Sequence, residues 1–136
     1  MIKPIMKSEF FLRLPSEDAG PDDAATGQDL LDTLLEHEHE CVGLAANMIG
    51  VRKRIICVKD GNRTLLMYNP QILEQVNAYQ ASEGCLSLIG ERPCTRYRRI
   101  KVEYLDENFV HRIKNFSGYT AEIIQHEIDH CRGIVI

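Results

Sequence analysis

The sequence predicts an α+β fold in which mainly antiparallel β-sheets pack around a central metal-binding helix near the C-terminus, with an amphipathic helix on the N-terminal side. Three observations predict it. Short β-rich runs follow one another between residues 54 and 113, apolar residues recur at helical spacing on either side of these runs, and the last helical segment carries two histidines four residues apart. Strands that do not alternate with helices favour an α+β fold.

The length of the chain, 136 residues, suits one domain covering residues 1–136, and such a domain buries roughly two-thirds of the surface that its unfolded chain exposes. The 5 cysteines are odd in number and contain no C-x-x-C pair. A reducing compartment is therefore favoured over a disulfide framework, and we expect a cytoplasmic protein. Near the N-terminus, the compact apolar cluster Phe10-Phe11-Leu12 is far shorter than a signal-peptide core or a membrane span.

Acidic residues exceed basic ones by 20 to 16, and the formal charge of −4 gives no general attraction to nucleic acid. The local exception is the basic run from Arg92 to Lys101, which also contains Tyr97. Such a run could contact RNA, but a solvated strand edge that discourages edge-to-edge pairing is the favoured interpretation. We expect neither a specific nucleic-acid partner nor a membrane partner.

The N-terminal third is expected to contain an arm, a helix and a loop. Prolines and glycines interrupt any periodic pattern in residues 1–21, which predicts an irregular arm. From Asp22, leucines recur at helical spacing with acidic residues mostly on the other side, which predicts an amphipathic helix ending near Glu40. The small residues from Cys41 to Gly50 are expected to form a tightly packed loop.

The middle of the chain is expected to be β-structure. Residues 54–58 and 64–68 predict a hairpin around the turn signal Asp60-Gly61-Asn62, with Asn69-Pro70 ending the second strand and a polar stretch following it. Gly118 precedes the final helix. The other short β-rich runs are residues 83–87, 100–104, 110–113 and a terminal strand at 134–136.

The final helix carries His126, Glu127 and His130, the pattern H-E-x-x-H. Residues four apart lie one above the other on a helix, so both imidazoles can bind one metal ion, while the glutamate takes a proton from a water molecule on the metal. Two histidines at this spacing also occur on solvated helix faces, and the motif alone leaves both interpretations open. A tetrahedral site needs a third protein ligand elsewhere in the chain.

Three segments in this order resemble the three motifs of the peptide deformylase family. They are Gly43-Leu44-Ala45-Ala46, Glu83-Gly84-Cys85-Leu86-Ser87 and Gln125-His126-Glu127-Ile128-Asp129-His130. The segment Gln28-Asp29-Leu30-Leu31-Asp32 also looks like that family. Three ordered motifs are far more specific than any one of them.

The resemblance implies one divalent metal ion per chain, bound by Cys85, His126 and His130 with water as the fourth ligand. Iron(II) is expected in the cell, although this donor set also suits zinc, nickel and cobalt. The resemblance further implies that Glu127 is the general acid/base of a metal-dependent amide hydrolase, and that the backbone N–H of Leu86 contacts the developing oxyanion.

The resemblance also implies a substrate and the residues that hold it. The substrate would be an N-formylmethionyl nascent peptide, with formate as product. Its binding positions match Gly43, Met48, Glu83 and Gly84, with supporting positions at Arg96, as the partner of Glu83, and Gln125. A transient association with the ribosome would follow from such a substrate.

Two departures from the family pattern matter. The first motif usually reads Ala-Ala-Pro-Gln, whereas here Ala46 is followed by Asn47 and Met48, and a thioether cannot donate the hydrogen bond of the missing glutamine. The chain also ends at Ile136 without the C-terminal helix that many relatives have, so a ribosome contact through that helix is not expected.

A metal-dependent deformylase is the leading hypothesis. The alternative is a deformylase-like protein that binds metal and formyl-Met peptides with little turnover, which Met48 supports. A purely structural metal site is disfavoured because Glu127 beside an open fourth position is typical of catalysis. A general metallopeptidase is weaker still, since no long peptide cleft is recognisable.

Overall fold

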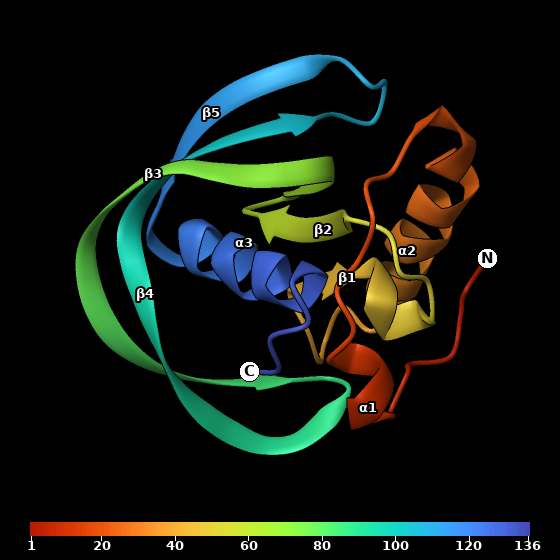
Figure 1. Ribbon diagram of the computed structural model, residues 1–136, viewed down its shortest axis with the longest axis horizontal. Helices are drawn as coiled ribbons and strands as arrows, with labels where there is room; N and C mark the ends of the chain where they lie inside the picture. The colour runs from red at the N-terminus through yellow and green to blue at the C-terminus, as the bar shows by residue number, and fades with distance from the viewer.

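A five-stranded antiparallel sheet curls around one long helix in the computed structural model, which describes residues 1–136. The strands pair in chain order: β1 (Gly43–Ala45), β2 (Ile55–Asp60), β3 (Arg63–Cys85), β4 (Leu88–Leu105) and β5 (His111–Ser117). The helix α3 (Gly118–Cys131) lies inside the curve (Figure 1), against β1, β2 and β4. The predicted α+β fold with a central C-terminal helix is confirmed.

The strand β3 is much longer than the sequence predicts. Asn69-Pro70 does not end it, and the polar residues that follow continue the strand as far as Cys85. The pairing with β4 shifts register between Tyr68 and Gln71, where Asn69 has φ 52°. A β-bulge bends its strand and tolerates a proline. β3 and β4 accordingly sweep around α3 as a curved ribbon (Figure 1).

The helix α2 (Ala24–Glu36) is shorter than predicted. It ends at Glu36 rather than near Glu40, because the backbone turns at His37, whose N–H bonds back to the carbonyls of Thr33 and Leu34. Residues 37–40 form a turn that leads into β1. The predicted loop from Cys41 to Gly50 contains β1 and the 3₁₀ helix η2 (Ala46–Ile49), and Gly50 closes it with φ 85°.

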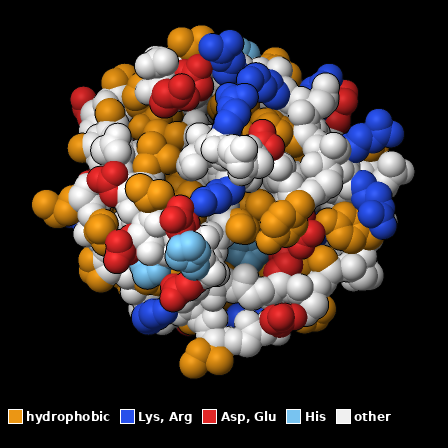
Figure 2. Space-filling view, turned by 180° about the vertical axis from the view of Figure 1, so that it is seen from behind, with side chains coloured by type: hydrophobic (Ala, Val, Ile, Leu, Met, Phe, Trp, Pro, Cys, Tyr) orange, Lys and Arg blue, Asp and Glu red, His pale blue; other side chains and the backbone are white.

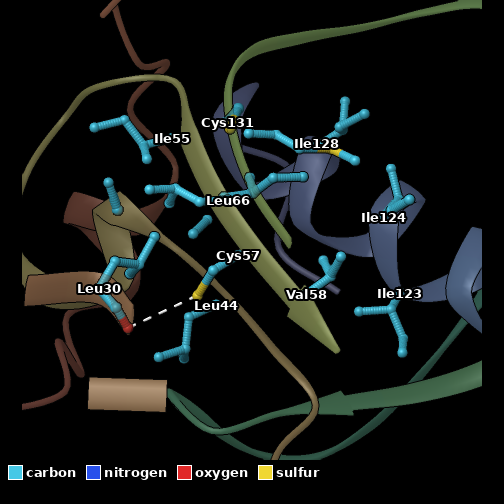
Figure 3. Packing of buried hydrophobic residues seen from close by; sticks show 14 of the residues in the cluster. Leu30, Leu44, Ile55, Cys57, Val58, Leu66, Ile123, Ile124, Ile128 and Cys131 are labelled. Atoms are coloured by element: carbon cyan, nitrogen blue, oxygen red, sulfur yellow. Dashed lines mark hydrogen bonds between the residues drawn. The ribbon is translucent and has the colours of Figure 1, made fainter. Parts of the chain in front are cut away.

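The main core lies between the sheet and the two longer helices. Side chains of β2 separate the helices, with Ile55 and Val58 among them, while Leu30 approaches from α2 and Ile124 and Ile128 approach from α3 (Figure 3). Cys57 in β2 lies close to the Leu30 carbonyl, at 3.7 Å from sulfur to oxygen. Burying several such aliphatic side chains stabilises the fold by roughly 1.5–3 kcal/mol each, which fixes α3 in place for the chemistry it carries.

The two ends of the chain differ from expectation in detail. The N-terminal arm contains the short helix α1 (Glu9–Leu12), and the 3₁₀ helix η1 (Pro21–Asp23) precedes α2. Residues 134–136 do not form a strand, since the N–H of Ile134 bonds to the carbonyl of Asp129 at the end of α3. None of the helices has the length and apolar character needed to cross a membrane.

The basic run from Arg92 to Lys101 is not simply a solvated edge. It belongs to β4, which pairs with β3 along its whole length and with β5 from Arg99 onward. Arg96 within the run is buried, at 4% exposure. Successive side chains of a strand point to opposite faces of the sheet. The prediction did not take this alternation into account, and it is what turns Arg96 inward.

Candidate active site

The two histidines of α3 share one buried face. His126 is 7% exposed and His130 0%, and their Nε2 atoms lie 3.3 Å apart. Gln125 fixes the rotation of the helix, because its side chain donates to the Tyr97 carbonyl at 2.8 Å and accepts from the Tyr97 N–H at 2.9 Å. The helix is thereby attached to β4 with both ring nitrogens facing the same point.

Glu83 on β3 orients the first of these imidazoles. Its Oε1 lies 2.8 Å from Nδ1 of His126, and Arg96 donates to the same carboxylate from Nη2 at 2.7 Å. Arg96 also donates to Asp129 at 2.7 Å. Because Nδ1 of His126 is engaged by Glu83, its Nε2 is the nitrogen left for a metal ion.

The Glu83–Arg96 pair is buried rather than an ordinary surface pair, since its side chains are 8% and 5% exposed. Burial opposes charge on Glu83, but the hydrogen bonds from His126 and Arg96 outweigh burial and hold the pKa of Glu83 well below its usual value. Glu83 therefore stays ionised beneath His126.

Cys85 ends β3 at the tip of the β3–β4 hairpin, where the strand pairing shifts register after Gly84. Burial raises the pKa of the Cys85 thiol, but hydrogen bonds from His126 and from two backbone N–H groups outweigh burial and lower it. Burial likewise lowers the pKa of His126, while its contacts with Cys85 and Glu83 outweigh burial and raise it to about 10. The lowered pKa of Cys85 favours the thiolate, which is the form that binds a metal ion.

Glu127 is buried beside the histidines, at 4% exposure. Its Oε1 has no hydrogen-bond partner, and burial raises the pKa of this carboxyl to about 7. Gly43 of β1 lies against it: a Cβ on Gly43 would lie 3.0 Å from Oε2 of Glu127 and 2.7 Å from Cγ2 of Ile123. A glycine is needed for this close approach.

These groups fit a divalent metal ion. The ligand atoms of His126, Glu127 and His130 lie within 4.8 Å of one another and are all buried. Cys85 lies outside this group, but its side chain is hydrogen-bonded to His126. Burial lowers the pKa of His130 to about 3, so its imidazole is neutral, and its Nδ1 has no partner. A neutral imidazole at His130 and unpartnered buried atoms suit a borderline transition metal, and His126 would give up a proton as the metal binds.

A pocket of about 710 Å³ opens over this cluster. Gly43, Met48, Glu83, Gly84 and Leu86 all line it, so the structure brings the expected substrate-binding positions together. The carbonyl of Leu86 accepts from Nζ of Lys7 at 2.7 Å, and the Leu86 N–H donates to no other protein group. That N–H is free for an oxygen atom bound in the pocket.

The two residues that depart from the family pattern point in different directions. Met48 lines the pocket, and its sulfur accepts from the Ala45 N–H at 3.5 Å. Asn47 is 1% exposed, and its Nδ2 donates to the carbonyls of His130 at 2.9 Å and Leu12 at 3.5 Å. Asn47 therefore holds α1 and α3 together from within the core and does not reach the pocket.

Several residues of the site were missed from the sequence. Asp129 holds the far side of Arg96, and Glu122 lies in the pocket wall, where Tyr79 donates to it at 3.1 Å. Glu122 precedes His126 by four residues, so helical spacing could have placed it on the metal-binding face. No sequence signal connects Tyr79 with it, because β3 was not predicted there.

Comparison with known proteins agrees with this geometry. The profile of the polypeptide deformylase family matches residues 4–136. The chain is 52% identical to a peptide deformylase of Clostridium beijerinckii over 136 residues, which is 100% of both chains. The chain belongs to the peptide deformylase family.

Solved structures of peptide deformylases share its fold. One from Acinetobacter baumannii, with Met-Ala-Ser bound, superposes with a TM-score of 0.89 at 28% identity, covering 99% of this chain and 97% of that one. One from Thermus thermophilus has a TM-score of 0.86 at 32% identity, with 99% and 83% covered. Peptide deformylases are metal-dependent hydrolases, and the buried cluster on α3 is where this chain would hold its metal ion.

Proposed function

We propose that this protein removes the N-formyl group from N-formylmethionyl peptides and releases formate. The observation that carries the proposal is the buried cluster of His126, Glu127 and His130, joined by Cys85, beneath a pocket open to solvent. A structural metal site would not need an unpartnered carboxylate facing a pocket. The Met-Ala-Ser peptide bound by the Acinetobacter baumannii enzyme supports a peptide ligand of this kind.

Cys85, His126 and His130 would hold the metal ion, which supplies Lewis-acid activation of water and of the formyl carbonyl when bound. Glu83 and Arg96 would keep His126 in the tautomer that presents Nε2. We propose iron(II) as the ion used in the cell. Zinc, nickel and cobalt suit the same donors, and availability decides among them.

Glu127 would move the proton. Its buried carboxylate has no competing hydrogen-bond donor at Oε1, so it is free to accept a proton from the attacking water. As the water oxygen adds to the formyl carbon and the carbon–nitrogen bond breaks, the same carboxyl would return that proton to the departing amine. A pKa of about 7 suits both halves of this transfer at neutral pH.

The formyl oxygen gains negative charge during the reaction and needs donors. The free N–H of Leu86 is one. Gly43 and Gly84 leave room for the peptide beside it, since neither fills the pocket with a side chain. Met48 has no N–H or O–H to offer, and we propose that this chain therefore works with one donor fewer than relatives that carry glutamine.

The 52% identical relative named peptide deformylase supports an enzyme over a binder with little turnover. Nascent N-formylmethionyl chains would be the substrates. We therefore propose that the protein acts in the cytoplasm and associates transiently with the ribosome. The testing experiment is formate release from formyl-Met-Ala-Ser by the iron(II), nickel and zinc forms of the protein. Formate production that disappears on metal removal supports the proposal, and no formate from any form contradicts it.

A further inference from the structure

The ammonium group of Lys7, in the N-terminal arm, reaches the backbone of the turn that carries Leu86. Its Nζ donates to the Leu86 carbonyl at 2.7 Å. Figure 2 shows basic and acidic side chains intermingled over the surface, where exposed ion pairs hold their groups only weakly. The bond made by Lys7 is of another kind, because it goes to a carbonyl that no backbone N–H reaches.

The backbone of Lys7 is fixed on both sides. The N–H of Met6 donates to the carbonyl of Met48 at 2.7 Å. Ser8 begins α1, and its side chain accepts from the N–H of Phe11 at 3.2 Å. The helix α1 lies beside the β3–β4 turn (Figure 1) and contacts η2. Only the side chain of Lys7 therefore has to be ordered for its bond to the turn.

The carbonyl bound by Lys7 belongs to the peptide between Leu86 and Ser87, in the middle of the two-residue turn that joins β3 to β4. Cys85 and Leu88 pair on either side of this turn. Two-residue hairpin loops favour turns with positive φ at one or both central residues. Neither Leu86 nor Ser87 has a positive φ. Contacts from outside the hairpin therefore contribute to fixing the orientation of this peptide.

The other end of the same peptide faces a proposed metal ligand. The N–H of Ser87 is one of the two backbone donors to the sulfur of Cys85. Ser87 is 3% exposed, so this N–H points away from solvent. A trans peptide is planar, and its carbonyl and N–H point in opposite directions. Lys7 and the sulfur therefore hold one peptide plane from its two ends.

The charge on Lys7 adds to this geometry. An ammonium group forms a stronger hydrogen bond to a carbonyl than a neutral donor does. Hydrogen bonds in a chain polarise one another, so the bond at the Leu86 oxygen also strengthens the Ser87 N–H as a donor to sulfur. The Leu86 N–H lies in the adjoining peptide, so a movement of the turn would displace it as well.

We propose that Lys7 is a positioning residue of this site, which holds the Leu86–Ser87 peptide in one orientation. In that orientation the Ser87 N–H donates to the Cys85 sulfur, and the Leu86 N–H faces the pocket. The inference rests on the proposed function, in which this sulfur binds the metal ion and the Leu86 N–H contacts the oxyanion. Lys7 does not line the pocket and acts only through the turn.

The first test is the pair of variants Lys7→Met and Lys7→Arg on formyl-Met-Ala-Ser. Lys7→Met keeps a long side chain without a donor, and kcat should fall by about three- to tenfold. KM should change little, because the Leu86 N–H contact strengthens only as charge develops on the formyl oxygen. Lys7→Arg keeps a charged donor and should recover at least half of the parental kcat. An equal loss in both variants, or no loss in Lys7→Met, would overturn the inference.

Lys3→Met is the matched control. It makes the same charge change in the same arm, at a lysine that pairs with Asp29 of α2 at 3.9 Å and does not line the pocket. It should leave kcat at the parental value. An equal fall of kcat in Lys3→Met and Lys7→Met would assign the effect to net charge and overturn the role of Lys7.

The absorption spectrum of the cobalt(II)-loaded protein tests the contact with sulfur without turnover. A hydrogen bond stabilises the sulfur electrons, so weakening it should move the thiolate-to-cobalt charge-transfer band of Lys7→Met to longer wavelength. Lys7→Arg and Lys3→Met should keep the parental band. This pattern in a protein that releases no formate would support the positioning role and contradict the deformylase proposal alone. An unchanged band in Lys7→Met, with formate released, would overturn the positioning role alone.

Discussion

The side-chain amide of Asn47 donates to the carbonyl oxygen of His130 at 2.9 Å, which connects the loop of the first motif to the last turn of the metal-binding helix. Both groups are buried. The carbonyl belongs to a residue whose imidazole faces the metal site, while Met48, the next residue after Asn47, faces the pocket. Asn47 therefore links the position of the pocket wall to the position of a proposed metal ligand.

The first prediction concerns this link. Asn47→Ala should lower the free energy of unfolding by about 1–3 kcal/mol, because the buried Leu12 carbonyl loses its donor and the His130 carbonyl keeps only the Gly133 N–H. Urea unfolding of the metal-free and metal-loaded protein measures it. Asn47→Asp should destabilise more, since it directs a buried carboxylate at two carbonyls. An alanine variant as stable as the parent would mean that the amide is dispensable.

The second prediction concerns the donor missing from the pocket. Met48→Gln should raise kcat at least several-fold on formyl-Met-Ala-Ser, since loss of one oxyanion donor typically costs about 10²–10³ in kcat. The glutamine oxygen can accept from the Ala45 N–H as the sulfur now does, leaving its NH₂ group to donate. The gain should appear in kcat rather than KM, because the bond strengthens as charge develops.

Met48→Leu is the control for this change. It keeps an apolar side chain of similar size without a donor, so kcat should not rise. A native protein as fast as a relative that carries glutamine, with no gain from Met48→Gln, would mean that a water molecule or the backbone already supplies the donor.

The sequence predicted the architecture and the grouping of His126 and His130 on one helix face, but not the features set by long-range packing. The spacing of His126 and His130 suffices to place two imidazoles on one face, because helix geometry is local. The extension of β3 through residues 71–80 could not be predicted, since its polar side chains are largely exposed and carry no apolar alternation. Strand pairing with β4 overrides that weak local preference.

The positions of individual site residues also depend on long-range packing. Arg96 was placed near Glu83 only through family resemblance, since their contact depends on the β3–β4 register, which local sequence does not encode. The direction in which the Asn47 side chain points is set by the backbone conformation of residues 46–49, which the sequence does not specify. It lies in a 3₁₀ turn, which points Asn47 into the core and Met48 toward the pocket.

The third prediction concerns the glycine beside the proton-transfer group. Gly43→Ala should lower kcat about tenfold or more, because its Cβ would lie 3.0 Å from Oε2 of Glu127 and displace that carboxylate by a fraction of an ångström. Metal content should stay unchanged. Gly20→Ala is the control, since a Cβ there meets nothing within 4 Å. A Gly43→Ala protein with parental kcat would contradict the close contact.

The fourth prediction concerns Cys85, the proposed thiolate ligand. Cys85→Ser should sharply lower metal content after dialysis against a chelator, because serine replaces a thiolate with a weakly acidic hydroxyl. Metal analysis of the purified protein measures it. Cys57→Ser is the control, since the Cys57 thiol donates to the Leu30 carbonyl of α2 and serine keeps a donor there. A full equivalent of metal retained by Cys85→Ser would remove Cys85 from the ligand set.

The most direct test of the account is metal content and formate release measured together on Glu127→Gln. The amide is nearly isosteric with the carboxyl, but it cannot carry a proton from water to the departing amine. The account predicts close to one equivalent of metal and a rate on formyl-Met-Ala-Ser lower by about 10²–10⁴. A variant that keeps its metal and retains activity within a few-fold of the parent would contradict the assignment of Glu127 as the proton-transfer group of this site.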